Sequence, residues 1–284
     1  MDETFSFSLP PNWESQVQKA LEEDLGSGDL SAALIAPERN AQARVMVREE
    51  AVLCGSAWFG EVFRQLDPEV EVTWAAQEGQ WLAAGTCVVQ VRGRAQALLS
   101  AERTALNFLQ TLSGVATQTH HFVAAVQGYR AQIVDTRKTL PGLRLAQKYA
   151  VRVGGGQNHR LGLYDAILIK ENHIAAAGGL AQAYHSACSA GHPGQFIQLE
   201  VETLEQLQQA LDLGVPMLLL DNMTPAQQVQ AVAMTQGRAL LEVSGGVTLD
   251  TVRAIAATGV DRISVGALTK DVRAIDYSLR MQDA

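Results

Sequence analysis

The sequence lacks the features that mark several classes of protein. Within its 284 residues no apolar run approaches the roughly 18 residues that a membrane-spanning helix needs. Its three cysteines, Cys54, Cys87 and Cys188, are odd in number and show no CxxC spacing, so neither a disulfide framework nor a zinc site is expected. The first residues have no basic and apolar secretory signal, and the expected location is the cytoplasm.

Positive charge is also scarce. Lysine and arginine number 22 against 30 aspartates and glutamates, which gives a formal net charge of −8. General nucleic-acid binding normally requires a basic domain, so it is not expected here. The remaining composition, 47% hydrophobic and 18% charged, is that of a soluble globular protein with one large domain or two ordinary ones.

The first part of the chain has the pattern of a small α+β domain. Between about residues 40 and 95, short β-like runs surround one helical stretch, SAWFGEVFRQL, which predicts an antiparallel sheet with a helix. A long helical pattern over 95–127 follows. We expect this helix to break or bend at Ser113-Gly114.

Beyond that helix the pattern changes to β/α alternation. Seven apolar runs recur, as buried parallel strands do: QIVD, YAVRVGG, AILIK, FIQLE, MLLLD, ALLEVS and RISVG. Helical segments separate many of them, among them LEQLQQALDLG and TLDTVRAIAATG, and Thr248 is a plausible N-terminal cap for the second. The predicted fold class is α/β. It combines an N-terminal α+β domain over 1–114 with an incomplete, six- or seven-stranded β/α barrel over 115–274, and the tail 275–284 can pack back on the first domain.

Nearly every predicted strand ends in polar residues or glycine, in the clusters DTRK, GGGQNHR, KENH, EVE, DN, SGG and SVG. The active sites of β/α barrels are built at these strand ends. A barrel with a purely structural role would not need such clusters at nearly every strand. The pattern therefore favours an enzyme.

One segment, 135–173, concentrates cations against the charge of the whole chain. It contains seven lysines and arginines and only three acidic residues. A cleft lined by one sign of charge focuses the electrostatic field on ligands of the opposite sign. We therefore expect a small, multiply anionic substrate, although any single cation of the set could be an ordinary solvated surface residue.

The segment DTRKTLPGLRLAQKYAVRVGGGQNHRLGLYDAILIKENHI resembles the signature of the quinolinate phosphoribosyltransferases, the carboxylating nicotinate-nucleotide pyrophosphorylases. The similarity extends to EDLGSGDL, SAERTALNFLQTLSGVAT, LEVSGG and DRISVGALTK, and so covers almost the whole chain. It implies transfer of phosphoribose from phosphoribosyl pyrophosphate (PRPP) to quinolinate with decarboxylation. The products would be nicotinate mononucleotide, pyrophosphate and CO2, in de novo NAD biosynthesis.

The resemblance also implies roles for individual residues. Quinolinate recognition falls on Arg137, His159, Arg160 and Lys170, with Arg103 reaching the site from the neighbouring subunit of a homodimer or higher homo-oligomer. Local pairing of Arg103 with Glu102 is the alternative. Arginine suits bidentate pairing with carboxylates, whereas lysine supplies a compact point charge.

The remaining roles concern PRPP. Lys138 and Lys170 are expected to face its pyrophosphate, and Glu200 and Asp221 to lie near its ribose and a magnesium ion, directly or indirectly. Lys138, Lys170, Glu200 and Asp221 are thus the candidate catalytic residues. The loops after the last strands of a barrel often bind phosphate, which predicts a 5′-phosphate site at Ser244, Gly245, Gly246, Ser264, Val265 and Gly266. A structural ion pair is the alternative for the two carboxylates.

Other functions stay open at this point. A phosphoribosyltransferase of the same fold could act on another carboxylated ring. A barrel aldolase could use Lys170 to form a Schiff base. A barrel that binds PRPP without turnover is a third alternative.

Overall fold

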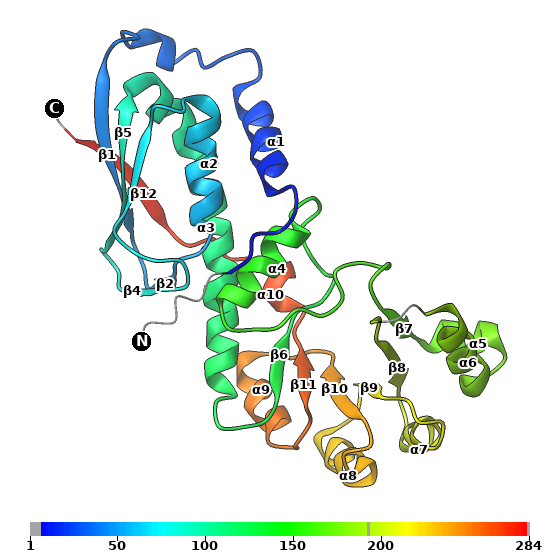
Figure 1. Ribbon diagram of the computed structural model, residues 1–284. Helices are drawn as coiled ribbons and strands as arrows, with labels where there is room; N and C mark the ends of the chain where they lie inside the picture. Colours follow the sequence, from blue (N-terminus) through cyan, green and yellow to red (C-terminus); the bar gives the residue numbers. More distant parts are fainter. Residues whose placement is uncertain (1–6, 192–193, 283–284) are drawn as a thin grey trace. The chain divides into compact units, whose positions relative to one another are not determined.

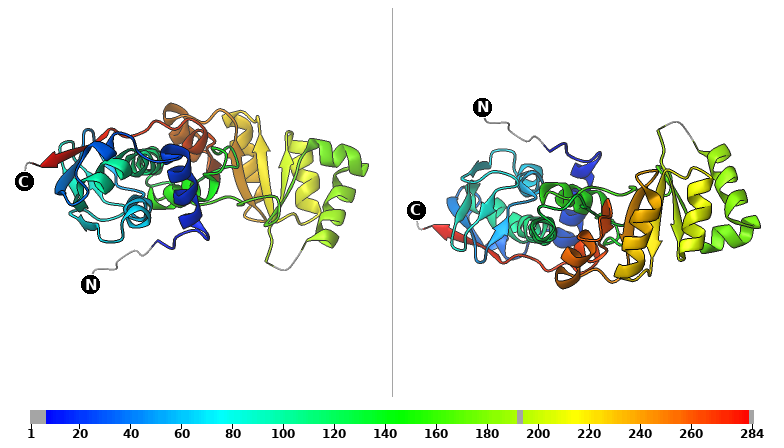
Figure 2. Two further views of the ribbon diagram at one scale, coloured as in Figure 1. Left: turned by 90° about the horizontal axis from the view of Figure 1, so that it is seen from above. Right: turned by 90° about the horizontal axis from the view of Figure 1, so that it is seen from below.

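The computed structural model describes residues 7–191 and 194–282, which form two compact units. The first unit contains residues 7–120, 140–155 and 272–282, and the second contains 121–139 and most of 156–271. Figures 1 and 2 show the elements of each. Among the described helices, none is long and apolar enough to cross a membrane.

The first unit is built on an antiparallel sheet with the strand order β12-β1-β5-β3. The strands are β1 (Asn40–Val47), β3 (Glu71–Trp74), β5 (Cys87–Arg94) and β12 (Tyr277–Gln282), and β2 (Ala51–Val52) pairs with β4 (Trp81–Leu82). Ala43, Val45 and Val47 of β1 are fully buried, because alternate residues of a strand point to the same face. The predicted α+β module is confirmed.

Four helices and a short 3-10 turn complete this unit. They are α1 (Trp13–Leu25), η1 (Ala32–Leu34), α2 (Ser56–Leu66), α3 (Ala95–Ala125), whose last residues belong to the second unit, and α4 (Arg144–Val153). Trp58 of α2 is fully buried and lies 5.5 Å from the ring of Trp13 and 5.1 Å from that of Tyr149. Its indole Nε1 donates a hydrogen bond to Gln16, so its polar atom is also satisfied.

The expected break at Ser113-Gly114 is wrong, because α3 runs without interruption through both residues. Ser113 and Gly114 instead allow neighbouring segments of the first unit to pack closely against α3. A Cβ atom on Gly114 would lie 2.2 Å from the carbonyl oxygen of Arg273. The buried hydroxyl of Ser113 donates to Cys54 O and lies 3.1 Å from the hydroxyl of Tyr277.

The second unit contains six parallel strands in the order β6-β11-β10-β9-β8-β7. Their bounds are Gln132–Val134 (β6), Ile167–Ile169 (β7), Ile197–Val201 (β8), Met217–Asp221 (β9), Leu240–Ser244 (β10) and Arg262–Ser264 (β11). The sheet does not close, since β6 and β7 are its two edges. This is the predicted incomplete barrel.

Helices connect successive strands and flank the sheet (Figure 1). They are α5 (Glu171–Ala177), α6 (Leu180–Ala190), α7 (Leu204–Asp212), α8 (Pro225–Thr235), α9 (Leu249–Ala256) and α10 (Ala267–Lys270). Thr203 and Thr224 each accept a hydrogen bond from a backbone N–H of the helix that follows, as N-cap residues do. Thr248 is the N-cap residue of α9, as expected.

One predicted strand is a helix. The run YAVRVGG forms the last turns of α4, where Ala146, Ala150 and Val153 are buried at helical spacing. A different residue takes the place beside β6: Gln157 forms a parallel bridge with Val134, its N–H donates to Ile133 O, and its carbonyl accepts from Asp135 N–H. This pairing places the next residues, Asn158 to Arg160, beside the edge of the sheet formed by β6.

The close approach at Gly114 gives a testable prediction about stability. We expect Gly114→Ala to lower the free energy of unfolding by roughly 1–3 kcal/mol, because the new methyl group overlaps a backbone carbonyl that cannot move freely. Gly60, inside α2, is the matched control, since a Cβ there meets nothing within 4 Å. Gly60→Ala should stabilise the protein by up to about 1 kcal/mol. Chemical denaturation of the three proteins measures both effects, and equal stabilities would contradict this account of the α3 packing.

Candidate active site

The parallel sheet collects the predicted site residues of the second unit at one edge, the carboxyl ends of its strands. The register sets Ser244 opposite Asp221 and Ser264 opposite Val134. Lys170 directly follows β7, and Glu200 lies on β8. Arg137 and Lys138 follow β6 by a few residues. In β/α folds this edge is where ligands bind.

Asp135, the residue that follows β6, organises the two segments that carry most of the arginines. Its side chain is fully buried. One carboxylate oxygen accepts a hydrogen bond of 2.6 Å from the amide of Asn158, and the other accepts one of 2.8 Å from the backbone N–H of His159. The segment with Arg137 and the segment with Arg160 are thus joined through one carboxylate.

Arg137 and Arg160 are close enough for their positive charges to repel each other. Burial and the nearby Arg137 guanidinium lower the pKa of Arg160, and Asp165 opposes this shift. The Nε atom of Arg137 is buried and has no hydrogen-bond partner in the part of the chain that the structure describes. Two neighbouring guanidinium groups that only Asp165 partly offsets suit a dicarboxylate or phosphate ligand.

His159 is turned into the sheet. Its side chain is 8% exposed, and its Nε2 lies 2.8 Å from Gln198 Oε1 and 3.5 Å from a carboxylate oxygen of Glu242. The backbone N–H of Arg160 donates to its Nδ1 at 2.8 Å. Both ring nitrogens therefore have partners inside the protein.

Lys170 and Glu200 form an ion pair with 2.6 Å between Lys170 Nζ and Glu200 Oε2. The lysine side chain is 46% exposed, whereas the glutamate is 6% exposed. The backbone N–H of Lys170 also donates to His173 Nδ1 at the start of α5. Schiff-base lysines are typically activated by an apolar pocket or a second cation, and an exposed lysine held by a carboxylate does not match that environment.

Asp221, at the end of β9, accepts a hydrogen bond from the side chain of Asn222 at 2.8 Å. Across from it, Gly245 has φ +102°, and a Cβ there would lie 3.9 Å from Asp221 Oδ1. Glu200 and Asp221 offer carboxylate oxygens from neighbouring strands, the donors that Mg²⁺ prefers. No group of three or more such side chains exists among residues 7–191 and 194–282, so the protein itself offers a magnesium ion few ligands.

Glycine-containing turns follow β10 and β11, and the second lies next to a lysine. The turn after β10 has positive φ at Gly245 and Gly246, where glycine costs no strain. After β11, the side chain of Lys138 packs directly against Gly266: a Cβ atom on this glycine would lie only 3.1 Å from Lys138 Cδ. Ser264 is buried and its hydroxyl donates to Val243 O, whereas Ser244 is only half-buried. Val265 is buried in the same turn, with its N–H bonded to Val134 O.

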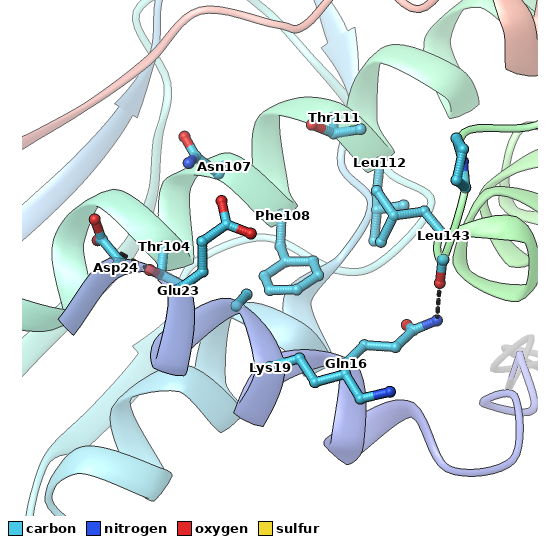
Figure 3. Close-up of a pocket in the computed structure, with 13 residues that line it drawn as sticks. Gln16, Lys19, Glu23, Asp24, Thr104, Asn107, Phe108, Thr111, Leu112 and Leu143 are labelled. Carbon is cyan, nitrogen blue, oxygen red and sulfur yellow. Dashed lines mark hydrogen bonds between the residues drawn. The ribbon is translucent and has the colours of Figure 1, made fainter. Parts of the chain in front are cut away.

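Arg103 lies in the first unit, exposed on α3. It makes no ion pair with Glu102 within the described residues. The next residue, Thr104, lines a cavity of about 490 Å³ between α1, α3 and the loop 141–143 (Figure 3). Phe108 and Leu112 provide apolar lining, and Lys19 and Glu23 line it from α1. None of the predicted site residues lines this cavity.

Three residues of the site were missed at the sequence level, namely Asp135, Gln198 and Glu242. Asp135 begins the strand-end cluster DTRK, but the sequence gives it no individual role. A signal for the other two was available, because Gln198 and Glu242 precede Glu200 and Ser244 by two positions. Period-two alternation places each pair on the same face of its strand.

The fold and the site together define an α/β-barrel enzyme for multiply anionic substrates, with cations, paired carboxylates and glycine turns at the carboxyl edge of a parallel sheet. Two family descriptions match the chain. "Quinolinate phosphoribosyl transferase, N-terminal domain" matches residues 29–113, and "Quinolinate phosphoribosyl transferase, C-terminal domain" matches residues 115–280. The chain belongs to the quinolinate phosphoribosyltransferase family.

Individual relatives agree along most of their length. A probable carboxylating nicotinate-nucleotide pyrophosphorylase from Bacillus subtilis is 41% identical over 257 residues, which cover 90% of this chain and 89% of the relative. Decarboxylating quinolinate phosphoribosyltransferase 1b from Nicotiana tabacum is 36% identical over 93% of this chain and 81% of its own. The solved nicotinate-nucleotide pyrophosphorylase of Francisella tularensis superposes with a TM-score of 0.93 at 42% identity, covering 97% of this chain and 98% of that one.

The like-charge pair predicts a specific coupling between stability and ligand binding. We expect a millimolar aromatic ortho-dicarboxylate, such as phthalate, to raise the melting temperature of the wild-type protein by roughly 5 °C, because a ligand at about 100 times its Kd adds about 2.7 kcal/mol. Arg160→Gln should lose this rise. Its ligand-free melting temperature should not fall, since the substitution removes repulsion with Arg137. A variant that melts well below wild type and still responds to the ligand would refute the clamp.

Proposed function

We propose that this chain transfers the phosphoribosyl group of PRPP to quinolinate with loss of CO2, giving nicotinate mononucleotide and pyrophosphate for NAD biosynthesis. The observation that carries the proposal is the Arg137–Arg160 pair, held by Asp135 beside the lysines and carboxylates of the same sheet edge. Quinolinate has adjacent carboxylates that match two guanidinium groups. The names of the relatives describe the same reaction.

The residues divide the two substrates between them. Arg137, Arg160 and Lys170 bind the carboxylates of quinolinate and orient its ring nitrogen toward the anomeric carbon of PRPP. The turns at Ser244–Gly246 and Ser264–Gly266 bind the 5′-phosphate. Lys138, beside Gly266, binds the departing pyrophosphate, with Lys170 as a second cation. Correct placement of two bound reactants accounts for a large share of the rate.

Bond exchange at the anomeric carbon needs no protein nucleophile. The ring nitrogen forms the new bond as the bond to pyrophosphate breaks, and the cations stabilise the growing negative charge on the leaving group. The nitrogen is then positively charged, so it stabilises the carbanion formed when the C2 carboxylate leaves as CO2. A proton replaces CO2 at C2. Glu200 and Asp221 would bind Mg²⁺ together with PRPP, and this ion would neutralise charge on the pyrophosphate.

The decisive assay incubates the protein with quinolinate, PRPP and Mg²⁺ and measures nicotinate mononucleotide and CO2. We expect turnover with quinolinate and none with nicotinate. Arg137→Ala should raise the KM for quinolinate by roughly 30-fold or more, since a lost charge pair costs about 2 kcal/mol or more. Turnover of nicotinate in place of quinolinate would contradict the substrate assignment.

The matched control is Arg238→Ala. Arg238 is exposed and precedes β10, at the opposite end of that strand from Ser244, where it donates to carbonyls at the end of α8. Its loss should leave both KM values within about twofold of wild type, as expected for an exposed side chain. An equal loss in both variants would show that removing any arginine harms the protein, and not that Arg137 binds substrate.

We further propose that the chain works as a homodimer in which Arg103 completes the quinolinate site of the neighbouring copy. Two observations support this. Arg103 is exposed on α3. Leu30, just before η1, and Leu34, its last residue, are 88% and 86% exposed, which is unusual for leucines that face only water.

Mixing inactive variants tests the shared site. Arg103→Ala and Arg137→Ala, unfolded together and refolded, should recover about a quarter of wild-type activity, because half of the random dimers contain one intact site of two. Arg137→Ala mixed with Arg160→Ala should recover none, since both residues belong to the same side of the site. Absence of recovery in the first mixture would rule out a site shared between copies.

A further inference from the structure

The environment of His159 indicates which of its nitrogens carries the proton. The backbone N–H of Arg160 donates to Nδ1 at 2.8 Å, so Nδ1 must present a lone pair. The ring hydrogen then lies on Nε2, which donates to Gln198 Oε1 at 2.8 Å. Glu242 Oε1 lies 3.5 Å from the same nitrogen and makes no hydrogen bond to it, so its contribution is electrostatic attraction for the Nε2 hydrogen.

Both of these side chains come from the interior of the sheet. Gln198 on β8 is fully buried, and Glu242 on β10 is 1% exposed. Glu242 is held in turn near Arg262 of β11, with 3.6 Å between Glu242 Oε2 and Arg262 Nε. A buried carboxylate and a buried amide are costly in a barrel core, which suggests that they are kept for the contact that they make.

The ring also bridges distant strands. Its own segment begins at Gln157, which pairs with β6 at one edge of the open sheet, whereas Gln198 lies on β8 near the other edge. Through its contact with Gln198, the imidazole therefore connects the segment beside β6, which carries Arg160, to a strand near the opposite edge of the sheet. Its Nδ1 holds the N–H of Arg160, so the orientation of the ring fixes the backbone from which that guanidinium projects.

We propose that His159 positions Arg160, and that Gln198, with the nearby Glu242 carboxylate, sets the orientation and tautomer of its ring. If Gln198 did not accept from Nε2–H, the ring could rotate and release the Arg160 N–H. The two carboxylate-binding arginines would then lose their fixed spacing. The effect on quinolinate rests on the proposed function, but the tautomer does not.

The first measurement needs no substrate. In protein labelled with ¹⁵N-histidine, the His159 signals are identified by their loss in His159→Asn. Wild type should show an unprotonated Nδ1 and a protonated Nε2 whose hydrogen exchanges slowly with water. In Gln198→Met, which keeps the length of the side chain but removes the acceptor, the Nε2 hydrogen should exchange rapidly. A proton on Nδ1 in wild type would overturn the proposal.

The second measurement separates positioning from general stability. Gln198→Met should raise the KM for quinolinate by about 3- to 10-fold, the effect of one hydrogen bond, with the KM for PRPP unchanged within about twofold. Glu242→Gln should have a smaller effect than Gln198→Met. Gln209→Leu, at an exposed position of α7, is the control and should behave as wild type.

Each remaining outcome is decisive. An unchanged KM for quinolinate in Gln198→Met, or a parallel loss of melting temperature, kcat and both affinities, would refute a positioning role. If the wild-type protein fails to turn over quinolinate at all, the proposed function fails. The NMR result would still decide the tautomer and the contact of His159 with Gln198.

Discussion

A single buried carboxylate holds the candidate site together. Asp135 lies at the point where β6 ends, and it receives hydrogen bonds from the side chain of Asn158 and from the backbone of His159. Every cation of the 135–138 segment and of the 157–160 segment depends on this junction for its place. The cost of burying the charge is offset by donors whose own positions the carboxylate fixes. Apart from the bridge between Gln157 and Val134, no strand pairing connects the segment 135–138 to the segment 157–160. Removing the Asp135 carboxylate would therefore loosen the contact between these two segments.

The second unit shows which structural features can be recognised from sequence. All six strands, β6 to β11, follow from runs rich in Ile, Leu and Val, because buried parallel strands need apolar side chains on both faces. YAVRVGG contains the same residue types but forms the end of α4, since its buried positions follow a helical period with Ala146 and Ala150. Short apolar runs cannot be assigned by composition alone. The residue that pairs with the other side of β6, away from β11, is Gln157, a single polar residue with no apolar pattern around it.

The same distinction applies to the residues of the site. Charge concentration and strand ends are visible in a one-dimensional sequence, which is why Arg137, Arg160, Lys170, Glu200 and Asp221 could be selected. The direction of a side chain is not visible there. His159 has the residue type of a ligand, yet its ring is directed to Gln198 and Glu242. Ser113-Gly114 similarly has the composition of a helix break, but the contacts that require those residues come from Cys54, Arg273 and Tyr277, far away in the sequence.

The pairing of β1 with β12 has a consequence for how the chain acquires its structure. Val47 lies opposite Tyr277, and the hydroxyl of Tyr277 meets Ser113 inside the first unit. During synthesis from the N-terminus, the sheet of this unit remains one strand short until residues 277–282 have left the ribosome. The barrel strands, whose pairings lie between residues 132 and 264, are all available earlier. The first unit is therefore completed only after the parallel sheet is available, and until then β1 has an unpaired edge, the kind of surface on which chains aggregate.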